Sequence, residues 1–183
     1  MRKSVLATSA MVVMLAVGCS TSRKDAPLKA FTEDQQKKVV DKSVSVQAEP
    51  LFWAALYEPT RDDLEGLRAA WNEHSRAFPE SRAIQEIEKV LAAPGERPLL
   101  VALFTSDTDK ADLSSKSLGW SVSPVPQQIK ELDNADQPLR ALFPVKNTWA
   151  RYYLLKYTSP VWADAVALVL ALPQGKVELT RVR

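Results

Sequence analysis

Cysteine and histidine are almost absent from this chain. Its 183 residues contain one of each, Cys19 and His74. Zinc sites need clusters of these residues and disulfides need pairs of cysteines, so we expect neither. A lone histidine with no Gly-x-Ser-x-Gly motif gives little support for nucleophilic catalysis, because a base needs a nucleophile and an orienting partner beside it. We therefore predict no catalytic residue, no metal and no cofactor, and interpret His74 as a residue of a helix face.

Glycine is also scarce, and neither sign of charge dominates. The five glycines are too widely separated to form a loop that cradles phosphate groups. The chain has 24 Lys plus Arg and 22 Asp plus Glu, and two of the basic residues lie within its first three positions. The remainder is balanced in charge and lacks the basic patch that nucleic acids require. We therefore predict no nucleic-acid partner.

Two acidic segments are the remaining candidates for a metal site. Asp107, Asp109 and Asp112 follow an apolar stretch, and carboxylates on a loop at the edge of a sheet can bind calcium. An EF-hand loop, however, needs glycine at the position of Asp112 and a glutamate at its end, and this segment has neither. Residues 133–136 form a second polar cluster of the same kind. We interpret both segments as solvated turns.

The most informative segment is the N-terminus. Two basic residues precede an apolar run from Val5 to Val17, and Gly18 and Cys19 follow it. Charge, a short apolar run and small residues, in that order, are typical of a secretory signal peptide. The apolar run is shorter than the roughly 20 residues that a spanning helix needs. Because the cysteine comes directly after the small residues, residues 1–20 resemble the signal peptide and lipobox of bacterial lipoproteins.

That resemblance implies cleavage before Cys19 and attachment of acyl chains to this residue. Two acyl chains suffice for stable membrane attachment, whereas one does not. Ser20, rather than aspartate, follows the cysteine, which in this class implies the outer membrane, with the domain facing the periplasm. An ordinary cleaved signal peptide and a retained anchor are the alternatives. The expected partners are thus the membrane, through covalent lipid at Cys19, and a protein of the cell envelope.

The chain divides into three parts. Residues 1–18 are the expected signal peptide, residues 19–38 the lipidated cysteine with a flexible tether, and residues 39–183 a single globular domain. The second part is polar, with Leu28 and Phe31 as its only large apolar residues. The alternative is that these two residues pack on the domain and shorten the tether. A mature chain of about 165 residues is long enough for one domain with a substantial core.

Apolar periodicity predicts an α+β domain that is mostly β. Thr60 marks the start of a helix that extends to about residue 78, and Pro79 suits the first turn of a second helix that ends at Pro94-Gly95. The expected strands are residues 39–48, 52–57, 99–105, 118–125, 139–145, 150–158, 165–172 and 176–182. Short strands about ten residues apart are typical of antiparallel sandwiches. We therefore predict an antiparallel β-sandwich-like domain with two helices inserted after the first strands.

The densest aromatic segment extends from Trp149 to Tyr157. On a strand, Arg151, Tyr153 and Tyr157 share one face, and these three residues form a candidate partner surface because Tyr, Trp and Arg dominate binding hot spots. Both faces of this strand carry apolar side chains, so the alternative is a core strand covered on both sides. We predict a lipid-anchored envelope protein that binds or scaffolds a partner near the membrane. The alternative function is a periplasmic accessory that binds or hydrolyses cell-wall or carbohydrate ligands.

Overall fold

The structure is a computed structural model that describes residues 26–46, 49–74, 77–106, 111–113, 120–158, 165–172 and 175–182. The predicted signal peptide, the predicted lipidation site Cys19, and Asp107 and Asp109 lie outside the described residues. No helix within the described ranges is long and apolar enough to cross a membrane.

The described residues form helices and antiparallel strands in two sheets. The helices are α1 (Ala26–Lys38), α2 (Arg61–His74), α3 (Arg82–Ala92) and α4 (Gln137–Leu142). The strands are β1 (Val40–Val46), β2 (Glu49–Tyr57), β3 (Glu96–Thr105), β4 (Trp120–Ser123), β5 (Gln128–Leu132), β6 (Arg151–Thr158), β7 (Ala165–Leu172) and β8 (Gly175–Val182). The larger sheet has five strands in the order β1-β2-β3-β6-β5, and the smaller has three in the order β4-β7-β8.

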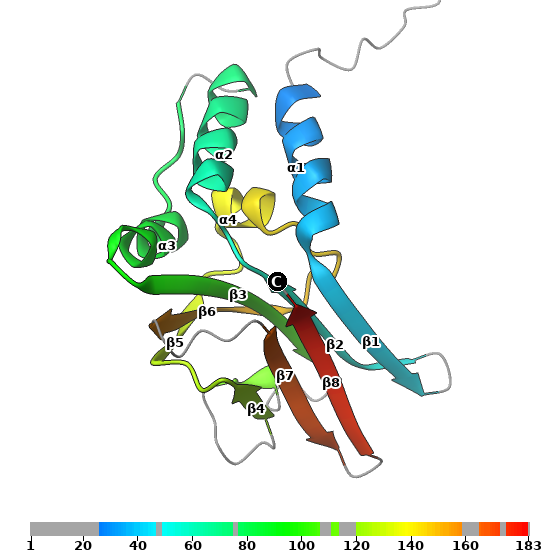
Figure 1. Cartoon of the computed structure of the whole chain (residues 1–183). Helices are drawn as coiled ribbons and strands as arrows, with labels where there is room; N and C mark the ends of the chain where they lie inside the picture. Colours follow the sequence, from blue (N-terminus) through cyan, green and yellow to red (C-terminus); the bar gives the residue numbers. More distant parts are fainter. Residues whose placement is uncertain are drawn as a thin grey trace, which may run out of the picture.

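The two faces of the five-stranded sheet belong to different clusters of buried residues. Along β2, Trp53, Ala55 and Tyr57 join the cluster that includes buried residues of α2, α3 and α4. The intervening Phe52, Ala54 and Leu56 join a second cluster, which includes Leu179 of β8. This alternation follows from the two-residue period of a strand. Figure 1 shows the same arrangement, with the helices gathered on one side of the large sheet and β4, β7 and β8 on the other.

The predicted fold class is confirmed at the coarser level. The domain is α+β and rich in antiparallel strands, and α2 and α3 follow the first two strands as expected. Thr60 caps α2, because its Oγ1 accepts a hydrogen bond from the Asp63 amide at 3.2 Å while Asp63 Oδ2 accepts one from the Thr60 amide at 2.9 Å. A sandwich is not shown, and the five-stranded sheet does not close on itself.

One predicted strand, residues 139–145, was wrong, and part of this segment belongs to the short helix α4. Asp136 caps that helix, and Pro138 lies in its first turn, where a missing amide hydrogen costs nothing. Leu139 and Leu142 then point into the helix-side core at helical spacing. One edge strand of the large sheet, β5, was not predicted, because its sequence Gln-Ile-Lys-Glu-Leu is mostly polar.

The prediction of a flexible tether does not hold for residues 26–38, which form α1. Leu28 and Phe31 are half-buried and pack against the helix-side core, as the alternative interpretation proposed. Phe31 lies against Gly66 of α2, where an added Cβ would be only 3.2 Å from Phe31 Cε2. The close crossing of the two helices therefore accounts for a glycine in the interior of α2, where it otherwise weakens the helix.

Candidate functional site

Two of the three residues predicted as a partner surface are core residues. Tyr153 and Tyr157 lie on β6 with 1% and 0% of their surface exposed. The Tyr153 hydroxyl donates a hydrogen bond to the Ala111 carbonyl oxygen at 2.6 Å. Burial raises the pKa of Tyr153 to about 12 and also raises the pKa of Tyr157, so both remain neutral phenols. These tyrosines support the sheet, which corrects the prediction that they form a binding surface.

Arg151 is the one member of the predicted surface that reaches solvent. Its Nε and Nη2 donate to the two carboxylate oxygens of Glu131 on β5, at 2.8 and 2.7 Å. The guanidinium also lies over the Tyr153 ring, 5.8 Å from its centroid. The Glu131 carboxylate raises the pKa of Arg151. This forked pair joins β5 to β6 and charges the edge strand, which protects an open edge against pairing with other chains.

The aromatic residue that the segment does expose is Trp149. It precedes β6 and has 79% of its surface exposed. Its amide donates to Asn147 Oδ1 at 2.9 Å, which fixes the backbone of this turn. A single exposed tryptophan is common on protein surfaces and does not by itself mark a site.

The other candidate residues lie apart from one another. His74 is half-buried at the last position of α2. Asp112 is described, whereas the two aspartates expected beside it lie outside the described residues. In the part of the chain that the structure describes, no three His, Cys, Asp or Glu side chains are grouped so that they could hold a metal ion. The polar turn at residues 133–136 has a structural role, because its Asp136 caps α4.

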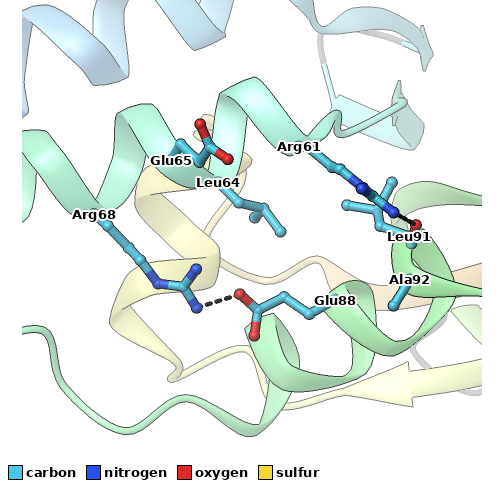
Figure 2. A pocket seen from close by; sticks show the side chains of 7 residues that line it. All are labelled: Arg61, Leu64, Glu65, Arg68, Glu88, Leu91 and Ala92. Atoms are coloured by element: carbon cyan, nitrogen blue, oxygen red, sulfur yellow. Dashed lines mark hydrogen bonds and ion pairs between the residues drawn. The ribbon is translucent and has the colours of Figure 1, made fainter.

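A hollow of about 300 Å³ lies between α2 and α3 (Figure 2). Its lining combines apolar and charged side chains: Arg61, Leu64, Glu65, Arg68, Glu88, Leu91 and Ala92. Leu64 points into the space between the helices, while Arg61 crosses it to donate to the Leu91 carbonyl oxygen at 2.9 Å. The volume is at the lower end of the range for small-molecule sites.

Three of the four charged residues of this hollow, Arg61, Arg68 and Glu88, make contacts within the protein. Arg68 of α2 pairs with Glu88 of α3 and lies over the Phe78 ring, 5.6 Å from its centroid. No serine, cysteine or histidine is among the lining residues, and the carboxylates of the hollow are those of Glu65 and Glu88. The hollow thus has an apolar floor and charged side chains at its rim, a composition that also occurs at protein–protein contacts.

A second group of polar residues lies where α1 meets α2, with Asp63 and Gln35 buried and Lys38 exposed. Asp63, with 5% of its surface exposed, accepts hydrogen bonds from Lys38 Nζ at 2.6 Å and Gln35 Nε2 at 3.2 Å. Gln35 Oε1 in turn accepts one from the Tyr57 hydroxyl at 2.7 Å. Burial alone raises the pKa of Asp63, but the hydrogen bonds from Lys38, Tyr57 and Thr60 outweigh it and lower the pKa to about 2. Asp63 is therefore a carboxylate that joins α1, α2 and β2.

Sequence reasoning missed both of these groupings. It assigned Lys38 to a tether and treated Asp63 only as a residue of the first helical turn, so no pattern connected the two. The hollow was missed because its lining residues alternate with core positions on two amphipathic helices. The available signal was the charge of opposite sign on facing turns, Arg68 and Glu88, but its recognition required the packing of α2 on α3.

Comparisons with known proteins identify no relative. No protein family matches the chain, no curated protein matches its sequence, and no solved structure matches its fold.

Proposed function

We propose that this chain is an exported, lipid-anchored protein of the bacterial cell envelope that binds a partner protein close to the membrane. The observation that carries the proposal is the order of residues 1–19, in which a charged start, a short apolar run and small residues lead to Cys19. Lipidation also gives a role to a solitary cysteine, which an oxidising compartment would otherwise leave unpaired.

The short distance between the anchor and the first helix supports a position near the bilayer. Only the residues from Cys19 to Ala26 lie between the proposed acyl chains and the start of α1. Fully extended, that stretch spans at most about 25 Å. The domain is thus held close to the membrane surface, which suits the presentation of a binding face to another membrane-associated protein.

The hollow between α2 and α3 is the proposed contact. Its apolar residues accept an apolar side chain of the partner, and its arginines supply the kind of side chain that is enriched in binding hot spots. Ala92 lines the hollow and is exposed, so Ala92→Arg fills it without removing a packed side chain. Ala69 is an exposed alanine of α2 outside the lining, and Ala69→Arg is therefore the matched control.

The test has two parts. Fatty-acid labelling of cells that express the full chain should label the wild type and not Cys19→Ala, and an unlabelled wild type would remove the anchor. Co-purification from solubilised membranes should recover a protein with the wild type and with Ala69→Arg, but not with Ala92→Arg. Recovery of equal amounts with all three would exclude the hollow as the contact. Recovery of cell-wall fragments in place of protein would favour the alternative function.

A further inference from the structure

The first helix buries fewer large apolar side chains than the other described helices of eight or more residues. α2 and α3 each bury several large apolar side chains, including Leu67 and Trp71 in α2 and Ile84 and Ile87 in α3. In α1 the fully buried residue among those described is a polar one, Gln35. Its large apolar residues, Leu28 and Phe31, are only half-buried. Segments with few buried apolar contacts are the ones that open locally while the rest of a protein stays folded.

The contacts of α1 are also confined to one side of the domain. The helix packs on α2 and α4, and Val39 is the only residue between it and β1. Figure 1 shows α1 standing beside α2 as a continuation of β1, away from β3 and β6 in the middle of the sheet. Release of α1 therefore requires a change of backbone conformation only near Val39, and it disturbs no strand pairing.

One charged contact provides the specific attachment. Lys38 Nζ lies 2.6 Å from Asp63 Oδ1, and Asp63 is buried beneath α1. When α1 leaves, water replaces Lys38 and Gln35 around the carboxylate. The hydrogen bonds from the Thr60 amide and hydroxyl to Asp63 Oδ2, at 2.9 and 2.8 Å, come from the start of α2 and persist. Asp63 is thus satisfied in both states, so neither state leaves an orphaned buried charge.

We propose that α1 is a separable strap that releases from α2 and α4 as a unit, and that the Lys38–Asp63 contact sets how readily it does so. Its consequence for reach rests on the proposed lipid anchor. A released helix of 13 residues adds about 20 Å to the distance that the domain can stand from the bilayer, at 1.5 Å per residue. The strap then gives the domain a near and a far position, and force applied between membrane and domain favours the far one.

Hydrogen exchange of the full chain in detergent tests the strap. In the wild type, we expect the amides of α1 to exchange at least roughly 100-fold faster than those of β3 and β6. Lys38→Met should speed exchange in α1 by roughly tenfold, because it removes the contact with Asp63. Amides of β3 and β6, which exchange through global unfolding, should speed up by no more than the same factor. Lys37→Met is the matched control, because Lys37 pairs with the exposed Asp34 and does not reach Asp63.

Other outcomes overturn the proposal. Exchange of α1 at the same rate as β3 and β6 in the wild type would show that α1 unfolds only with the whole domain. Equal effects of Lys38→Met and Lys37→Met would show that the Asp63 contact does not control release. The wild-type comparison decides the question even if Lys38→Met fails to fold. The intact mass of the same sample reports the acyl chains separately, so a failed strap and a failed anchor are distinguishable.

Discussion

Ser81 and Asp136 lie 55 residues apart in the chain and join the starts of two helices. The Ser81 hydroxyl donates to the Asp136 carboxylate at 2.7 and 2.8 Å, and its oxygen accepts from the Ile84 amide at 3.0 Å, which caps α3. Asp136 accepts from the Leu139 amide at 3.0 Å, which caps α4. The two caps therefore share one network, so each helix start holds the other in place.

Loss of the Asp136 carboxylate should destabilise both helix starts. We expect Asp136→Ala to lower the free energy of unfolding by about 2–3 kcal/mol, because a cap is worth about 1 kcal/mol and the buried Ser81 hydroxyl loses its acceptor. Asp136→Asn retains an oxygen and should cost less. Urea unfolding measures both variants against Asp133→Ala, which changes an exposed residue of the same turn. Equal stability of Asp133→Ala and Asp136→Ala would contradict the shared network.

The sequence predicted most elements because their apolar residues follow clear periods. The helices α2 and α3 carry apolar residues at helical spacing, and the strands β2, β3 and β6 carry apolar runs that the structure buries on both faces. Residues 139–145 were misassigned because a run of apolar residues fits a buried strand as well as a helix. The deciding signal was local: Asp136 as a cap, followed by Pro138 in the first turn.

The polar groups of the domain were harder to predict than its core. Lys38 and Asp63 are 25 residues apart, and their contact exists only because α1 folds back on α2. Tyr153 and Tyr157 were ambiguous for a different reason. Tyrosine suits both cores and interfaces, and only the cover on both faces of β6, from the helices and from Leu179 of β8, decides for the core.

Stability should fall in acid through Asp63. Its pKa is lowered from 3.8 to about 2 in the folded protein, so the ionised form stabilises the fold above the pKa of the unfolded chain. This contribution, about 2 kcal/mol, is present above about pH 4 and is lost as pH falls towards 2. The free energy of unfolding of the wild type should therefore decline as the pH falls from 6 to 2, and that of Asp63→Asn should decline less. Parallel curves for the two proteins would contradict the lowered pKa.

Substitution of Gly66 should separate the stability of the domain from the attachment of α1. Alanine favours the interior of α2 by about 1 kcal/mol, but its Cβ would lie 3.2 Å from Phe31 Cε2. Phe31 is half-buried on a weakly held helix, so we expect it to move. Gly66→Ala should then raise the free energy of global unfolding while amides of α1 exchange faster. A lower free energy of global unfolding with unchanged exchange in α1 would mean that the Phe31 side chain cannot move away from the added Cβ.

The aromatic segment before and within β6 contains its own matched pair. Tyr153 is buried with its hydroxyl bonded to Ala111, whereas Trp149 is exposed a few residues earlier. We expect Tyr153→Ala to lower the free energy of unfolding by about 3–5 kcal/mol, and Tyr153→Phe, which removes only the hydrogen bond, by about 1 kcal/mol. Trp149→Ala should change stability by less than about 0.5 kcal/mol, since its side chain packs on little. Thermal melts run beside co-purification check these values. Loss of partner recovery by a Tyr153→Phe protein that melts like the wild type would show that this hydroxyl contacts the partner, which its burial does not allow.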